Sequence, residues 1–141
     1  MAINFFQEET SFQLSKKLLR KKWLKLIAEK EEFKILDLNY IFCSDEYLYN
    51  INVEYLDHHT YTDIITFDNS DNELKIEGDI FISIDRVKEN SEKLQVSIDD
   101  ELSRVISHGL FHLMGYKDKK KEEARLMRNK EESAINLFKN I

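Results

Sequence analysis

The residues best suited to chemistry lie in one short stretch, His-Gly-Leu-Phe-His-Leu-Met-Gly-Tyr-Lys-Asp, at positions 108–118. Four residues turn a helix through about 400°, so His108 and His112 project from nearly the same face and their imidazoles can converge on one cation. Gly115 can adopt a left-handed conformation, which would end the helix and return the chain toward the same point. Asp118 then arrives as a third ligand, so the sequence predicts a metal site.

The spacing H-x-x-x-H-x-x-G-x-x-D matches the three-ligand arrangement of metzincin-type sites, with Asp in place of the last His. Three protein ligands leave a fourth position open for water, as in catalytic zinc sites, and we expect one zinc ion per chain. Two imidazoles and a carboxylate also suit nickel and other borderline metals. Two ordinary histidines on a helix are the alternative, but the Gly and the carboxylate favour metal binding. His58 and His59 are expected to face solvent in a loop.

Gly109 occupies the position beside the first histidine. Metalloproteases of the H-E-x-x-H type carry a glutamate there as general base, and glycine cannot move a proton. A metallopeptidase is therefore disfavoured. Activation of water would then depend on the metal, on a carboxylate from elsewhere in the chain, or on a phosphate of the substrate.

The elements that must position these residues follow from periodicity and capping signals. The chain has no proline and three glycines among 141 residues, so most of it should be regular structure. We expect one α+β domain over residues 1–141, with the metal site at the end of a buried helix. The expected strands cover about 2–6, 35–43, 63–68 and 76–84, and the expected helices about 10–30, 44–54, 86–94, 97–115 and 120–138.

Local signals predict where some helices begin and which face of the second strand is buried. Thr10 and Gln13 have capping-box spacing for the first helix, and Ser44 and Ser97 are placed to cap two later ones. In the second strand, alternation puts Leu36 on the buried face.

Composition limits the classes of function. The net charge of -6 argues against a protein that coats nucleic acid non-specifically. The basic cluster of residues 16–25 is either a solvated helix face or a phosphate-binding surface. The lone Cys43 cannot form an internal disulfide and fits the core. Neither a signal peptide nor a membrane span is recognisable, so a reducing cytosolic location is expected.

The same stretch resembles the signature of a known family. The run His-Gly-x-x-His-Leu-x-Gly-Tyr at 108–116 is similar to that of the YbeY family, bacterial rRNA maturation factors described as single-strand-specific, metal-dependent endoribonucleases. Asn-Val-Glu-Tyr at 52–55, Thr-Asp-Ile-Ile-Thr-Phe at 62–67 and Gly-Asp-Ile at 78–80 resemble further family motifs, in the family's order. Together the similarity covers roughly residues 35–120.

The resemblance implies a central mixed sheet flanked by helices, with a zinc site at the end of the motif helix. It also implies cytoplasmic processing of rRNA precursors, including the 3′ end of 16S rRNA, and a role in ribosome quality control. A ribosomal subunit or ribosomal protein is a further implied partner. A rival hypothesis is a non-catalytic rRNA- or ribosome-binding assembly factor with a structural metal. The sequence leaves the oligomeric state and the bond that is cleaved open.

Two positions depart from the family pattern. Asp118 stands where the family usually has a third histidine, and a carboxylate should make the metal less electrophilic. Leu56 stands where the family often has a basic residue, so another cation would have to contact the substrate phosphate. The lysines beside the ligands could replace it, or they could simply be the start of a surface helix; they are Lys117, Lys119, Lys120 and Lys121.

Two aspartates come from the family-like strand motifs, Asp63 and Asp79. We expect them to support the metal ligands or to transfer protons. Each could equally be a structural residue at the end of a strand or in the ladder. They are the catalytic candidates that the sequence offers.

Overall fold

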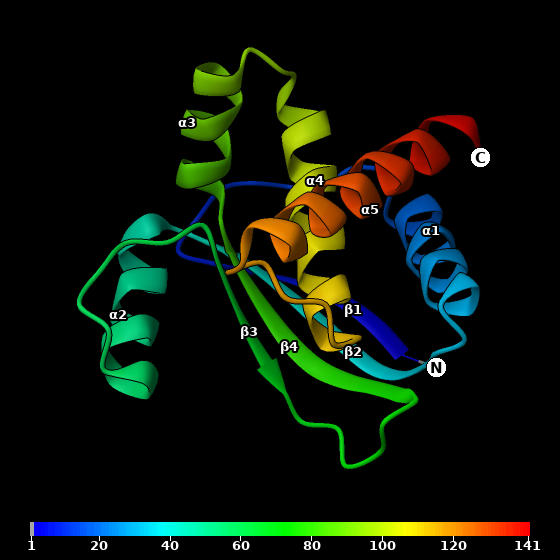
Figure 1. The fold of residues 1–141 in the computed structure, drawn as a ribbon. Helices are drawn as coiled ribbons and strands as arrows, with labels where there is room; N and C mark the ends of the chain where they lie inside the picture. The colour runs from blue at the N-terminus through cyan, green and yellow to red at the C-terminus, as the bar shows by residue number, and fades with distance from the viewer. Residues whose placement is uncertain (1) are drawn as a thin grey trace.

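The computed structural model describes residues 2–141, which form one α+β domain of four strands and five helices (Figure 1). The expected number, type and order of elements are confirmed. In chain order the elements are β1 (Ala2–Glu8), α1 (Lys17–Lys30), β2 (Lys34–Cys43), α2 (Asp45–Leu56), β3 (Ile64–Asp68), β4 (Lys75–Ser83), α3 (Ile84–Leu94), α4 (Ile98–Leu113) and α5 (Lys121–Asn140).

The four strands form one mixed sheet in the order β1-β2-β4-β3. β1 pairs parallel to β2, and β2 pairs parallel to β4, whereas β3 pairs antiparallel to β4 across a short connection. The parallel pairs need crossover connections, and the helices α1 and α2 lie in those connections. The mixed sheet that the family resemblance implies is therefore confirmed.

Helices cover the two faces of the sheet unequally. α1, α4 and α5 gather on one face, where the main core lies (Figure 1). α2 contacts β3 and β4 and covers part of the other face over a smaller cluster of Cys43, Leu48 and Ile65. Burial raises the pKa of the Cys43 thiol to about 12, which fits the expectation that it is a core residue rather than a reactive one.

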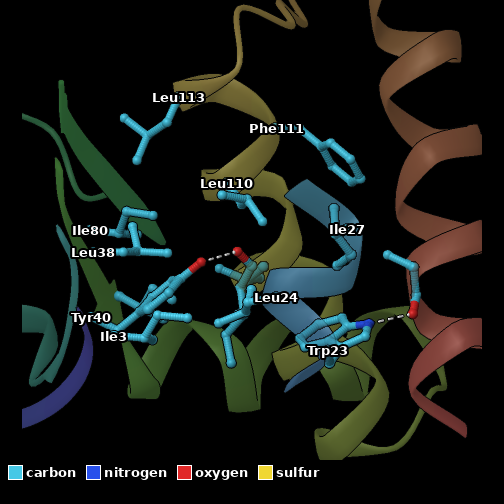
Figure 2. Close-up of a cluster of buried hydrophobic side chains, with 14 of the residues drawn as sticks. Ile3, Trp23, Leu24, Ile27, Leu38, Tyr40, Ile80, Leu110, Phe111 and Leu113 are labelled. Atoms are coloured by element: carbon cyan, nitrogen blue, oxygen red, sulfur yellow. Dashed lines mark hydrogen bonds between the residues drawn. The ribbon is translucent and has the colours of Figure 1, made fainter. Parts of the chain in front are cut away.

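Two hydrogen bonds from aromatic side chains join the layers of the main core (Figure 2). The Tyr40 hydroxyl on β2 donates to the carbonyl of Ile106 on α4 at 2.8 Å. The Trp23 indole on α1 donates to the carbonyl of Ala134 on α5, also at 2.8 Å. Because a buried donor without a partner is costly, these bonds fix the contacts of α4 with the sheet and of α1 with α5.

Glycines occupy two positions at which α4 packs against β3 and β4. A Cβ atom on Gly109 would lie 3.0 Å from side-chain atoms of Ile64 and Ile80. A Cβ atom on Gly78 would lie 2.8 Å from both Leu113 Cδ1 and the backbone oxygen of Phe67. Glycine at position 109 therefore suits this packing, because any larger residue would have to displace the two isoleucine side chains.

The predicted start of the first helix is wrong. α1 begins at Lys17, and the Thr10 hydroxyl accepts a hydrogen bond from the Phe12 amide in a local turn instead of capping a helix. Leu14 is buried, and the Phe12 ring packs against Phe42 at 5.4 Å between centroids. Burial of these side chains along the crossover outweighs the local capping signal.

Two further expectations about burial are corrected. The register of β2 with β4 shifts between Ile35 and Asp37, so Ile35 is buried and Leu36 is only partly buried. Arg20 does not belong to a solvated basic face, because it is 1% exposed, donates to Ser103 and stacks over Phe138 at 4.6 Å.

The predicted caps Ser44 and Ser97 are confirmed, each accepting an amide hydrogen bond in the first turn. Among residues 2–141, no helix combines the length and the apolar character needed to cross a membrane.

The close contact of Gly78 gives a stability prediction. We expect Gly78→Ala to lower the free energy of unfolding by about 1–3 kcal/mol, because the added methyl group meets a backbone oxygen that cannot move freely. Urea denaturation followed by circular dichroism measures the change. Lys75→Ala, at an exposed position on the same strand, is the control and should change stability by less than about 0.5 kcal/mol. Equal stability of the two variants would contradict the packing argument.

Candidate metal centre

The predicted ligands come from the last two turns of α4 and the loop that follows it. α4 is amphipathic, with Leu102, Val105, Ile106 and Leu110 facing the core, so the histidines point away from the sheet. The helix ends at Leu113, two residues earlier than predicted, and Gly115 has φ +97° in the loop. This left-handed residue turns the chain back, as expected, and brings Asp118 to the histidines.

Three ligand atoms converge on one point. The Nε2 atoms of His108 and His112 are 2.9 Å apart, and Asp118 Oδ2 lies 3.3 Å from the first and 3.5 Å from the second. Ligands about 2.0–2.1 Å from a tetrahedral zinc are about 3.4 Å from one another. The three side chains could therefore hold a metal ion with small adjustments.

The other ring nitrogen of each histidine is engaged by a hydrogen-bond acceptor. His112 Nδ1 lies 2.9 Å from the carbonyl oxygen of Tyr116, and His108 Nδ1 lies 2.5 Å from Glu131 Oε2. The Tyr116 carbonyl can only accept, so His112 Nδ1 donates to it, and the Glu131 carboxylate is placed to accept from His108 Nδ1 in the same way. With a proton on Nδ1 of each ring, both Nε2 lone pairs and the Asp118 oxygen would face the same point, which a divalent cation satisfies.

A partly buried ionic cluster lies behind His108. Arg104, one turn earlier on α4, makes two hydrogen bonds to Glu101, at 2.8 and 2.6 Å, and lies 3.5 Å from Glu131 and 3.7 Å from Asp63. The hydrogen bond to Glu101 raises the pKa of Arg104 against the opposing effect of burial, so the guanidinium stays charged. Three carboxylates around one guanidinium leave excess negative charge beside the ligands, which favours a cation at the site.

A separate cluster fixes the loop that supports His112. The Tyr116 hydroxyl donates to Glu31 at 2.6 Å, and Lys130 Nζ lies 2.7 Å from the same carboxylate. Burial acts to raise the pKa of Glu31, but the hydrogen bonds from Lys130 and Tyr116 lower it below its ordinary value. The phenol is thereby held between α1 and α5, which in turn places the Tyr116 carbonyl against His112.

The two aspartates that the sequence offered as catalytic candidates lie in different places. Asp63 precedes β3 and belongs to the ionic cluster through Arg104. Asp79 faces the opposite side of the sheet from α4, since its neighbours Gly78 and Ile80 contact that helix. Its carboxylate accepts hydrogen bonds from Asn39 at 3.0 Å and Asn69 at 3.3 Å. The structure thus joins Asp63 to the ionic cluster behind His108, whereas Asp79 lies on the other side of the sheet.

His112 borders two surface hollows that differ in charge. A hollow of about 480 Å³ contains His112, three lysines and two acids, namely Lys117, Lys119, Lys120, Asp118 and Glu123. A second hollow, of about 430 Å³, adjoins His112 from the connection between β3 and β4, where its wall includes acidic residues, namely Asp68, Asp71 and Glu73. Another hollow of about 510 Å³ lies at the opposite end of α4 and contains none of the ligands. Leu56, exposed at the end of α2, lines none of these three hollows.

The sequence interpretation missed the residues behind the ligands. Arg104 shares the face of His108 at a spacing of four, which was a visible signal. Glu131 lies on the buried face of α5 with Met127 and Ala134, at helical spacing. His58 and His59 are exposed in the loop after α2, as expected. Asn52 of the family-like motif is buried and donates to the Thr60 carbonyl at 2.9 Å, so it holds that loop.

Comparison with known proteins gives a consistent result over nearly the whole chain. The family model described as Endoribonuclease YbeY matches residues 2–139. A protein of that name from Cytophaga hutchinsonii is 56% identical over 137 residues, covering 97% of this chain and 96% of its own. Another from Flavobacterium johnsoniae is 47% identical, covering 94% of this chain and 95% of its own.

A solved structure supports the fold independently. The solution structure of TM1509 from Thermotoga maritima matches with a TM-score of 0.69, covering 97% of this chain and 89% of that one. The two sequences are 24% identical, so this similarity concerns the arrangement of helices and strands.

The converging lone pairs predict metal binding that depends on Asp118. We expect protein purified without an affinity tag to carry about one divalent ion per chain, and Asp118→Ala to hold it at least about tenfold more weakly. Elemental mass spectrometry and titration with a competing chelator measure content and affinity. Asp71→Ala, which removes an exposed acid from the neighbouring hollow, should behave like the parent. A metal-free, well-folded parent would contradict the prediction.

Proposed function

This chain belongs to the Endoribonuclease YbeY family, and we propose that it hydrolyses RNA phosphodiester bonds at His108, His112 and Asp118, with one zinc ion per chain. The observation that carries this proposal is the convergence of three ligand atoms beside a hollow lined with lysines. Two neutral imidazoles and one carboxylate form a donor set that suits zinc. The choice of zinc rests on this donor chemistry.

The chemistry divides between the bound ion and the chain. A zinc ion with an open coordination position supplies a Lewis acid that polarises a phosphoryl oxygen and lowers the pKa of water. His108 and His112 would hold the ion through Nε2, since their Nδ1 atoms contact Glu131 and the Tyr116 carbonyl. Asp118 would be the third ligand, and its negative charge would lower the net charge of the site. Gly109 is packed against the sheet and takes no part in proton transfer.

The lysines beside the ligands support a phosphate-bearing substrate. Lys117, Lys119 and Lys120 line the hollow at His112 and make no ion pair among residues 2–141. Arg104 is already saturated by carboxylates, so it is a poor partner for phosphate. We therefore assign to these lysines the role of the basic residue that Leu56 replaces. The acidic wall on the other side of His112 would repel the RNA backbone.

The family and the sequence motifs support a narrower biological role. We propose that the substrate is single-stranded RNA in rRNA precursors, including the 3′ end of 16S rRNA, and that the protein acts in ribosome maturation and quality control in the cytoplasm. Recognition of a ribosomal subunit or ribosomal protein would supply the selectivity that three surface lysines cannot, because phosphate contacts carry no sequence information.

A non-catalytic assembly factor with a structural metal is the second candidate. Leu56 and the net charge of -6 favour it, since both weaken attraction to RNA. The open position that three protein ligands leave favours the enzyme, because structural zinc sites use four protein ligands. A metallopeptidase lacks support because the position of its general base is the packed Gly109.

Removal of both imidazoles tests the enzyme directly. We expect His108→Ala/His112→Ala to abolish zinc-dependent cleavage of a single-stranded RNA oligonucleotide, because two of the three ligands are lost. Gel electrophoresis of end-labelled RNA measures the rate. The control is His58→Ala/His59→Ala, which removes two exposed histidines and should cleave at the parent rate. RNA binding with no cleavage by the zinc-loaded parent would favour the assembly factor instead.

The lysine hollow gives a prediction about RNA affinity. We expect Lys117→Gln/Lys119→Gln/Lys120→Gln to weaken binding of single-stranded RNA and to reduce the slope of log affinity against log salt by about 2, because each lost phosphate contact changes it by about 0.7. Fluorescence anisotropy at several salt concentrations measures both. The matched control neutralises Lys17, Lys22 and Lys25, which are exposed on α1. If only the α1 variant loses affinity, the phosphate-binding surface lies on that helix.

A further inference from the structure

One carboxylate behind the metal ligands contacts neither the metal position nor the substrate hollow. Glu131 lies on α5, 23 residues after His108 in the chain, and is 4% exposed. A buried carboxylate is costly unless charged or hydrogen-bonding partners surround it. Its two oxygens divide their contacts, with Oε2 2.5 Å from His108 Nδ1 and Oε1 3.5 Å from Arg104 Nη1.

We propose that Glu131 is a positioning residue, which fixes His108 as the Nδ1–H tautomer and so presents Nε2 to the metal. This inference rests on the proposed function in one respect, namely that the site binds a metal. A ligand histidine whose second nitrogen is bound to a carboxylate has a fixed ring orientation and a more basic coordinating nitrogen. The Nδ1 partner of His112 is a neutral carbonyl, so the coordinating nitrogens of the two histidines differ in basicity.

The surroundings keep Glu131 in place. Arg104 lies between Glu101 and Glu131 and is held by the bidentate contact with Glu101, which is 1% exposed. The guanidinium therefore offers a fixed positive charge to Glu131 Oε1, while Oε2 stays directed at His108. Because Glu131 comes from α5 and His108 from α4, the packing of these two helices sets the position of the ligand.

A purely structural role for Glu131, as an ion pair between α4 and α5, makes a different prediction. It would affect stability but leave the tautomer of His108 and the metal affinity of folded protein unchanged. The test therefore uses two readouts other than activity: ¹⁵N–¹H correlation spectra of the imidazoles in metal-free full-length protein, and zinc affinity from competition with a chelator. His112 serves as an internal control in the spectra, because its Nδ1 partner is the Tyr116 carbonyl.

Glu131→Met removes the acceptor at similar size, and Glu131→Gln keeps an acceptor without the charge. We expect Glu131→Met to shift His108 away from the Nδ1–H tautomer, leave His112 as the Nδ1–H tautomer, and weaken zinc binding about 10- to 100-fold. Glu131→Gln should retain the tautomer and lose less affinity. Glu132→Met, at the exposed neighbouring position, is the matched control.

An unchanged His108 tautomer in Glu131→Met, with zinc affinity equal to that of Glu132→Met, would overturn the proposal. If Glu131→Met does not fold, the proposal is tested with Glu131→Gln. Parent-like zinc affinity of that variant would overturn the proposal, and a loss of affinity in the folded variant would support it. Should the parent bind no zinc, the proposed function fails, and the His108 spectra still decide whether Glu131 positions the ring.

Discussion

The site depends on how closely α4 lies against β4. Gly109 and Gly78 remove the two side chains that would hold the helix away from the sheet, and Tyr40 bonds to the helix backbone from β2. The apolar face of α4 is then fully used in the core, so the polar positions at a spacing of four must point outward. Those positions are Arg104, His108 and His112. One helix thus supplies core packing, two metal ligands and the guanidinium behind them.

The histidines are oriented from two different parts of the molecule. His108 is fixed through Glu131 on α5, whereas His112 is fixed through the carbonyl of Tyr116. The side chain of Tyr116 is in turn held by Glu31, which also binds Lys130. Docking of α5 contributes to both, and the Trp23 bond to Ala134 ties that helix to α1. The metal affinity of this protein should therefore be coupled to the packing of α5, although every predicted ligand precedes that helix in the chain.

The charge of the surface around His112 discriminates between the possible substrates more clearly than the shape of that surface does. The chain as a whole is acidic, yet lysines gather on one side of His112 and acids on the other. A local basic surface beside a metal favours a phosphodiester over a peptide, and Gly109 removes the general base that peptide hydrolysis by the H-E-x-x-H mechanism uses. The acidic net charge limits non-specific RNA binding, which suits an enzyme that must not cleave RNA at random.

The sequence by itself determined the order of the elements, two helix caps and the convergence of His108 and His112, because these follow from repeats and hydrogen bonds within a few residues. The mixed sheet was implied by the family resemblance. Gly115 and Asp118 were likewise predicted from local spacing. Only the tertiary structure decided where α1 begins, the register shift beside Leu36, and the orientation of Asp79 away from the site. It also decided the pairing of Glu131 with His108. These features depend on contacts between elements distant in the chain, where burial and ion pairing outweigh local preference, and no local periodicity specifies such partners.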